Sequence, residues 1–194
     1  MIENAVAFTT ETPSTDFSTH DVLTSGIGKG YFSLTSTTLY IGMDGITPLA
    51  STYTVVYIGN GVTNAAVTAP ATFTPTALPP AAGFLYAISF PTTGTAATLY
   101  QWNAAGPSWT MIAGGPTPVV GTGMATEEYS IPLTAMPLLA GASTITVLGS
   151  TVTNAGGGTA ATASTFPGGG MGYTHYVDYP VSSCLYPNDP AAIH

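Results

Sequence analysis

The sequence predicts an all-β protein, an antiparallel sandwich or barrel with very little helix. Three observations predict this: short apolar and β-branched runs recur along the chain, Gly, Pro and Asn turns separate them, and helical periodicity is almost missing. With 194 residues, of which 45% are hydrophobic, the chain has the length of about one domain and enough apolar side chains to form a core.

Each predicted strand is a short run rich in aromatic or β-branched residues that ends at a turn sequence. These runs cover residues 31–34, 38–43, 52–58, 84–90, 97–102, 108–112, 128–131, 143–148 and 172–179. Residues 103–107 (NAAGP) are a turn sequence between two of the runs, which predicts a hairpin.

The segments between the strands predict loops within one domain. Pro132 and Pro137 limit residues 133–140 to a helical turn at most. Residues 69–83 are rich in proline, and neither side of them offers a complete core, which favours a long loop over an interdomain linker. Glycine triplets at 156–158 and 168–170 bracket a segment that we expect to be a second loop of low complexity.

Charged residues are scarce and almost all acidic. The chain has one basic residue, Lys29, nine acidic residues and a formal net charge of −8. Nucleic-acid binding needs clustered Lys and Arg, and a coiled coil needs charged faces, so the composition excludes both classes. A protein surface with so few charged residues keeps a free monomer poorly soluble. We therefore expect that the surface is buried in a polymer, carries O-linked glycans or is displayed on a larger particle.

The near absence of Lys and Arg indicates an extracellular location, at a cell surface or a virion surface. Cys184 is the one cysteine, so no intrachain disulfide can form and a buried or idle thiol is expected. The first five residues lack the basic and apolar runs of a secretory signal, so we expect export after removal of a leader or by lysis with a virus particle. No membrane span is expected, because apolar runs such as residues 84–90 are too short.

A series of motifs occurs in order between about residues 20 and 190. They are YFSLTSTTLYIGMDG at 31–45, YTVVYIG at 53–59, LYQWNAAGPSW at 99–109, EEYSIPLTAM at 127–136 and an aromatic segment at 174–187. Together they resemble the β-sandwich domains at the C-terminus of glucodextranase-like proteins, relatives of the DOMON and family 9 carbohydrate-binding modules. The resemblance implies a secreted, non-catalytic, jelly-roll-like sandwich, a domain that this family often attaches to larger surface or carbohydrate-active proteins.

Residues that can support catalysis are few. The candidates are three histidines, nine carboxylates and Cys184, and no Gly-x-Ser-x-Gly motif is present. Glu127 and Glu128 are adjacent, so on a strand they point to opposite faces and cannot form the carboxylate pair of a glycosidase. We therefore expect that the protein is not an enzyme.

A structural calcium ion is the cofactor that the sequence best accommodates. Calcium prefers oxygen ligands from carboxylates and loop carbonyls, and the candidate donors are Asp16, Asp21, Asp44 and Asp178. No D-x-D-x-D loop is present, and solvated turn aspartates explain the same residues. We therefore expect no cofactor, and a structural calcium ion is the alternative that these residues leave open.

Aromatic residues suggest a second kind of site. Trp102 and Trp109, with Tyr86 and Tyr100, can stack on sugar rings as a glycan platform. Packing in the core of a hairpin is the favoured explanation of the two tryptophans, because the chain has few of the Asp, Asn, Gln and Arg residues that read sugar hydroxyls. The exposure of the two indoles should discriminate between the two interpretations.

The organisation of the chain leads to two functional hypotheses. We expect an N-terminal extension, residues 1–15, and a single β-sandwich domain, residues 16–194. Ile2, Val6 and Phe8 alternate in the extension, which we expect to add as a strand to a neighbouring subunit of a homo-oligomer or polymer. The first hypothesis is thus a structural subunit of a filament, surface layer or virion appendage, and the alternative is a carbohydrate-binding module for surface glycans.

Overall fold

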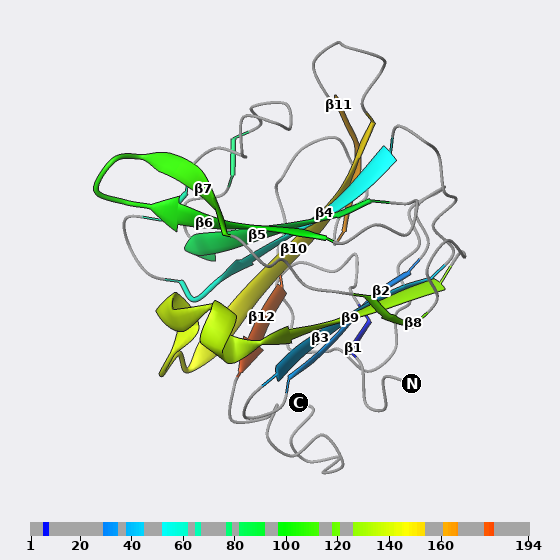
Figure 1. Cartoon of the computed structure of the whole chain (residues 1–194), viewed down its shortest axis with the longest axis horizontal. Helices are drawn as coiled ribbons and strands as arrows, with labels where there is room; N and C mark the ends of the chain where they lie inside the picture. The colour runs from blue at the N-terminus through cyan, green and yellow to red at the C-terminus, as the bar shows by residue number, and fades with distance from the viewer. Residues whose placement is uncertain are drawn as a thin grey trace.

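The protein is an all-β sandwich of two antiparallel sheets, as the sequence predicts (Figure 1). The computed structural model describes residues 6–7, 29–34, 38–44, 52–61, 65–66, 77–78, 82–91, 97–112, 118–120, 126–153, 161–166 and 177–180. Helical structure within these residues is limited to 3-10 conformation, at Ala82 and in two turns of three residues each.

The smaller sheet has five strands in the order β1-β2-β3-β9-β8. They are β1 (Val6–Ala7), β2 (Lys29–Leu34), β3 (Thr38–Asp44), β9 (Thr126–Pro132) and β8 (Pro118–Val120). Strand β1 comes from the N-terminal extension and pairs antiparallel with β2 of the same chain. Val6 lies opposite Phe32 and Ala7 opposite Tyr31, so one edge of this sheet is completed by the N-terminal segment.

The larger sheet has seven strands in the order β11-β10-β4-β5-β6-β7, with β12 beside β10. They are β4 (Thr52–Gly59), β5 (Phe84–Pro91), β6 (Thr98–Asn103), β7 (Ser108–Ile112), β10 (Thr144–Thr153), β11 (Ala161–Phe166) and β12 (Val177–Pro180). One edge of β10 pairs with β4, and the other is shared by β11 and β12. The strongly apolar runs of the sequence thus lie at the centre of this sheet.

The prediction of a low-complexity loop over residues 156–170 is wrong, because β11 occupies Ala161–Phe166. This segment, ATASTF, consists mostly of small residues, and its two threonines and one phenylalanine do not form the apolar run that marks the other strands. Its strand conformation follows from pairing with β10, from Gly149 opposite Phe166 to Thr153 opposite Ala161. Strand β8 was likewise not predicted, and it too is defined by its pairing, with β9.

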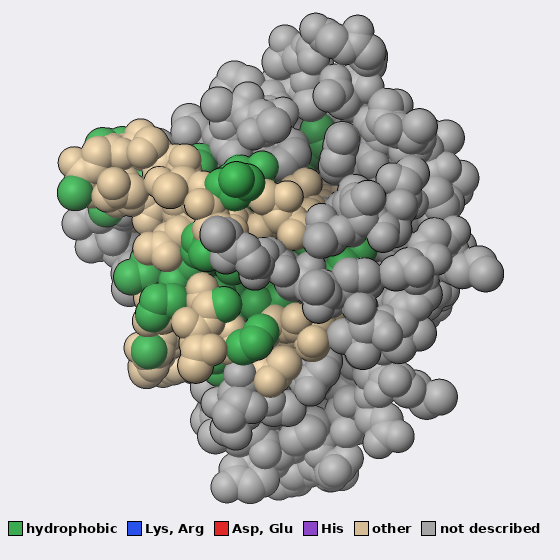
Figure 2. Space-filling view, in the orientation of Figure 1, with side chains coloured by type: hydrophobic (Ala, Val, Ile, Leu, Met, Phe, Trp, Pro, Cys, Tyr) green, Lys and Arg blue, Asp and Glu red, His purple; other side chains and the backbone are tan. Residues whose placement is uncertain are grey.

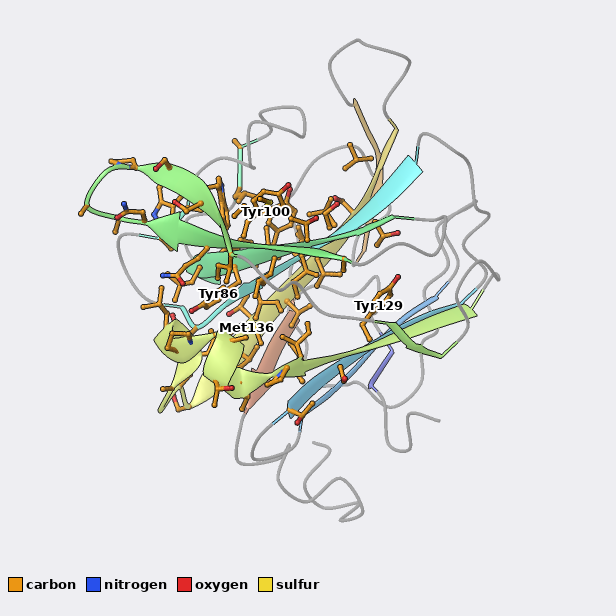
Figure 3. The ribbon with its side chains drawn as sticks, viewed as in Figure 1. Tyr86, Tyr100, Tyr129 and Met136 are labelled. Atoms are coloured by element: carbon orange, nitrogen blue, oxygen red, sulfur yellow. The ribbon has the colours of Figure 1, made fainter. Side chains whose placement is uncertain are left out.

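The main core lies between the two sheets. It combines residues of β3 and β9 from the smaller sheet with residues of β4, β5, β6 and β10 from the larger one. Its buried members are Leu39, Val56, Ile58, Leu85, Tyr86, Ile88, Ala97, Leu99, Tyr129, Ile131, Met136, Leu139, Ile145 and Val147. Figure 3 shows Tyr129 and Met136 in the space between the layers.

A second apolar cluster covers the opposite face of the larger sheet. Its buried members are Val55, Tyr57, Ala66, Leu78, Ala82, Phe84, Ala87, Trp102, Leu148 and Val152, and we call it the outer cluster. Central strands such as β4 are therefore buried on both faces, which explains their nearly continuous apolar sequences. Leu78 and Ala82 come from the proline-rich residues 69–83, so the described part of that segment packs on the sheet.

Gly59 allows residues 82–83 to approach the end of β4 closely. The N–H groups of Asn60 and Gly61 donate to the carbonyls of Gly83 and Ala82 at 3.2 and 3.3 Å. A Cβ on Gly59 would overlap the Gly83 carbonyl oxygen and lie 2.6 Å from the Ala82 oxygen. Glycine is thus required here for the approach of one backbone to another.

Two 3-10 turns, η2 (Leu133–Ala135) and η3 (Pro137–Leu139), follow β9 where the sequence allows only a helical turn. They close one end of the main core, since Met136 and Leu139 are buried in it and Leu133 and Ala135 pack against it. No helix among the described residues is long and apolar enough to span a membrane.

Candidate interaction surface

The β6–β7 hairpin is the part of the larger sheet that displays the predicted aromatic residues. Its strands pair from Leu99 opposite Ile112 to Asn103 opposite Ser108, which confirms the predicted hairpin. Local hydrogen bonds hold the turn: the Ala105 N–H donates to Asn103 Oδ1 at 3.1 Å, and Ser108 Oγ donates to the Gly106 carbonyl at 2.6 Å. Asn and Ser favour such turns because their side chains bond nearby backbone groups.

Trp102 and Trp109 lie opposite each other across this hairpin and belong to one aromatic group. Their ring centroids are 5.6 Å apart with planes at 64°, an edge-to-face contact. Trp109 also packs against Tyr57 of β4, with their ring centroids 6.4 Å apart. The ring centroids of Tyr57 and Phe84 of β5 are 5.8 Å apart. The four rings pack at steep angles to one another on the outer face of the sheet.

The predicted glycan-platform residues fall into two places. Trp102, Trp109 and Tyr100 lie together at the outer cluster, where Trp102 is 6% exposed and the other two are half-buried. Tyr86 is fully buried in the main core, on the other face of the same sheet, as the separation of Tyr86 from Tyr100 in Figure 3 shows. A flat, exposed aromatic surface does not arise from this arrangement, since the indoles meet edge to face.

Tyr86 instead holds the η2–η3 segment in place. Its hydroxyl oxygen accepts a hydrogen bond from the Leu138 N–H at 3.0 Å, and Asn60 Nδ2 donates to the Leu138 carbonyl at 3.2 Å. Burial raises the pKa of the Tyr86 phenol above its ordinary value of 10.0, and the hydrogen bond from Leu138 opposes this in part. The Leu138 backbone is thus bonded to Tyr86 of β5 and to Asn60, which follows β4, while the Leu138 side chain is 42% exposed.

The described surface carries no charge. No Asp, Glu, Lys, Arg or His occurs among the residues whose side chains the structure describes, and Figure 2 shows only apolar and uncharged polar side chains there. Met111 of β7, which is 65% exposed, and Leu138 are the large apolar side chains that stand out from this surface. Such a surface can make apolar and backbone contacts but, in its described part, no ion pairs.

The predicted calcium ligands are not gathered in one place as far as they can be located. Asp44 ends β3 in the smaller sheet, opposite Lys29 and Thr126, and Asp178 lies on β12 in the larger sheet. Asp16 and Asp21 lie outside the described residues, as do all three histidines and Cys184. Among the residues that are described, no group of three His, Cys, Asp or Glu could hold a metal ion.

The predicted donor strand is located in part. Val6 lies in β1, whereas Ile2 and Phe8 fall outside the described residues. Strand β1 pairs with β2 over two positions, and this pairing is within one chain.

Two members of the aromatic group, Tyr57 and Phe84, are absent from the residues that the sequence singles out. A signal was present, since residues 55–58 are apolar at every position, which indicates a strand buried on both faces. Only the strand order shows that the outer face of β4 and β5 meets the hairpin tryptophans.

No family model, curated protein or solved structure matches the chain.

Proposed function

We propose that the protein is a non-catalytic structural subunit of an extracellular assembly, such as a filament, surface layer or virion appendage. It self-associates through its β-sandwich and its N-terminal strand. One observation carries the proposal: in the described part of the chain, β1 completes an edge of the smaller sheet through two paired positions, Val6 with Phe32 and Ala7 with Tyr31. Each copy of the chain therefore has both a strand from its N-terminal segment and an edge that accepts such a strand.

Such a strand is well suited to exchange between copies. The same backbone hydrogen bonds form whether β1 pairs with its own β2 or with the β2 of a neighbour, so the enthalpic difference is small. Exchange in one direction is a head-to-tail contact, which generates a ring if it closes and a polymer if it does not. In this proposal Ile2, Val6 and Phe8 supply the apolar side chains of the donor strand.

The composition supports association over life as a free monomer. The chain has one basic and nine acidic residues in 194, and its described surface carries apolar and uncharged polar groups. When two copies meet through such surfaces, no charged groups have to be desolvated, and desolvation of charges costs free energy. Burial in an assembly also removes the exposed apolar groups that would otherwise lead to precipitation.

Deletion of residues 1–15 tests the proposal. We expect the full chain to form regular polymers or particle-bound copies in electron micrographs and the truncated chain to sediment as small species. The truncated chain should keep its β-type circular dichroism and a cooperative urea transition, because only two ladder positions of the described fold are removed. Polymers formed by the folded truncated chain would rule the donor strand out.

A pair of full-length variants gives a matched control. Val6→Lys places a charge in the donor strand, and Thr134→Lys places the same charge on an exposed residue of η2. We expect the first to prevent polymer growth and the second to leave it unchanged. Equal assembly of both variants would contradict the proposal.

A carbohydrate-binding module is the second candidate, and one observation favours it. Tyr100 and Trp109 keep part of their surface exposed at the outer cluster. Burial of Trp102 and the edge-to-face geometry of the indoles count against a flat platform. Retention on immobilised polysaccharides separates the two functions and is considered with the hairpin below.

A further inference from the structure

We propose that Asn60 is a site of covalent self-modification. It deamidates through attack by the Gly61 nitrogen, and the product weakens the attachment of the η2–η3 segment to the larger sheet. The inference is independent of the proposed function, because it concerns the chain directly after β4 and not a contact between copies. The reaction is the hydrolysis of a side-chain amide, and water is its one co-reactant.

The sequence marks Asn60 as the asparagine most open to this reaction. Deamidation begins when the backbone nitrogen of the next residue attacks the side-chain carbonyl carbon, so a side chain on that next residue hinders the approach. Glycine has no Cβ and the widest choice of backbone conformations. Of the six asparagines in the chain, Asn60 alone precedes glycine, whereas four precede alanine and one precedes aspartate.

The reaction proceeds through a cyclic imide. The Gly61 nitrogen gives its proton to solvent and bonds to Asn60 Cγ, and the bond from Cγ to Nδ2 breaks as ammonia leaves. Water then adds to either imide carbonyl and breaks the bond from that carbon to the nitrogen. The product is aspartate, or isoaspartate in which the main chain runs through Cγ. Either product carries one carboxylate in place of the neutral amide.

Gly61 has the backbone freedom that the attack requires. It is exposed and has a φ of 70°, a conformation that residues other than glycine rarely adopt. A Cβ on Gly61 would meet no atom of the described residues within 4 Å. The described structure thus leaves space around the attacking residue, and solvent reaches it.

The folded protein nevertheless restrains both reacting groups through hydrogen bonds. Asn60 Nδ2 donates to the Leu138 carbonyl at 3.2 Å, and the Gly61 N–H donates to the Ala82 carbonyl at 3.3 Å. The Gly61 nitrogen has to give up its bond to Ala82 before it bonds to Asn60 Cγ. We therefore expect the folded chain to deamidate slowly, through local opening at the end of β4, and the unfolded chain to deamidate faster.

Deamidation removes the donor that binds Leu138. A carboxylate and a carbonyl oxygen both accept hydrogen bonds and donate none, so the product cannot bond to the Leu138 carbonyl. The bond from the Leu138 N–H to the Tyr86 hydroxyl, at 3.0 Å, does not depend on Asn60. The η2–η3 segment, which closes one end of the main core, thus keeps one of its two described side-chain bonds at Leu138 and loses the other.

Peptide mass spectrometry of the full chain, incubated in mildly alkaline buffer, tests the site. Asn103 is the internal control, because it is exposed in the turn of the β6–β7 hairpin and precedes alanine. In the urea-unfolded chain, we expect a gain of about 1 Da at Asn60 to appear roughly 10-fold faster than at Asn103, with isoaspartate among the products. Equal rates at the two asparagines, or aspartate without isoaspartate, would overturn the route through Gly61.

The same incubation of the folded chain tests the restraint. The gain at Asn60 should appear in the folded chain, more slowly than in urea. No gain at Asn60 in the folded chain would overturn the site as a property of the native protein, and a rate equal to that in urea would overturn the restraint by the two hydrogen bonds.

Gly61→Ala isolates the role of the attacking residue. It is measured in urea, where the strain of alanine at the native φ of Gly61 has no effect. We expect it to slow deamidation at Asn60 roughly 10-fold and to leave Asn103 unchanged. An unchanged rate at Asn60 would contradict attack by the residue 61 nitrogen.

Two variants with the same change of charge test the consequence. Asn60→Asp loses the donor to Leu138, whereas Asn103→Asp keeps the oxygen that accepts from the Ala105 N–H. We expect amide hydrogen exchange at Leu138 to rise roughly 2- to 10-fold in the first variant and to stay unchanged in the second. Equal exchange in the two variants would contradict the weakened attachment. None of these measurements depends on whether the chain assembles, so their failure is distinct from failure of the proposed function.

Discussion

Single side chains attach the η2–η3 segment to the larger sheet. Leu138 is held on both sides of its backbone, by Tyr86 at its N–H and by Asn60 at its carbonyl. Buried backbone groups need such partners, since an unmade hydrogen bond costs more than a made one contributes. Two residues distant in sequence thus secure the end of the main core.

Tyr86→Phe is predicted to lower stability in a way that depends on pH. At pH 8 the variant loses the acceptor for the Leu138 N–H, and we expect a loss of about 1 kcal/mol in the free energy of unfolding. Because the folded-state pKa of Tyr86 is raised, the unfolded chain ionises first as pH passes 10.0, which destabilises the wild-type protein and not the variant.

Urea titrations from pH 8 to pH 11 measure this difference. The gap in free energy of unfolding between wild type and variant should narrow above pH 10. A gap that stays constant over that range would show that the burial of Tyr86 does not affect its ionisation in the folded protein.

Gly59→Ala is predicted to destabilise the protein by about 1–3 kcal/mol, because the new methyl group meets the backbone carbonyls of residues 82 and 83. Gly106→Ala is the matched control: its nearest neighbour would be Asn103 Nδ2 at 3.9 Å, and we expect a change within about 0.5 kcal/mol. Urea midpoints of the two variants provide the comparison. Equal midpoints would contradict the close approach seen at Gly59.

At the scale of elements, the hairpin is stabilised by its aromatic side chains. Trp102→Ala removes a buried indole from the outer cluster, and we expect a loss of about 3–5 kcal/mol in the free energy of unfolding. Leu138→Ala truncates an exposed side chain, and we expect it to change the free energy of unfolding by no more than about 0.5 kcal/mol. Chemical denaturation of both variants measures the contrast.

The hairpin also separates the two candidate functions. If the protein binds glycans through this surface, Trp109→Ala should weaken retention on an immobilised polysaccharide by roughly 1–3 kcal/mol, by analogy with stacking of bases on aromatic rings. For a structural subunit, we expect retention to be absent or unaffected by the substitution. Loss of retention in a stably folded Trp109→Ala protein would favour the carbohydrate-binding module.

Elements with a strong local pattern could be predicted from the sequence. The hairpin of β6 and β7 lies where residues 97–112 place it, and β4 and β5 match their β-branched and aromatic runs. Strand β11 was not predicted, because its Ala and Ser residues disfavour strands and interrupt any apolar run, and the pairing with β10 makes the segment a strand.

The sequence also predicts the positions of some site residues and not of others. Sequence proximity in the hairpin correctly brings Trp102 and Trp109 together. The sequence does not reveal that Tyr86 lies on the opposite face of the sheet from the two tryptophans. The face on which a strand residue lies depends on the register of its strand with the neighbouring strands, and here also on the bulge near Ile58 and Gly59. The aromatic group of the outer cluster therefore emerges only in three dimensions.

At the scale of the whole molecule, the larger sheet is covered on both faces and the smaller one is completed by the N-terminal strand. Removal of residues 1–15 should affect assembly far more than folding, since Val6 and Ala7 of β1 are the two positions of that segment that belong to a described ladder. The strand edges, rather than a cleft with charged groups, are where the described part of the molecule can meet other copies.

Composition and local periodicity are enough to predict the fold class, the strands with strong apolar patterns and the scarcity of charged residues. The tertiary structure alone decided which strands lie at sheet edges, which aromatic residues are buried and where β11 forms. These features depend on pairing between segments far apart in the chain, and such pairing leaves no local signal.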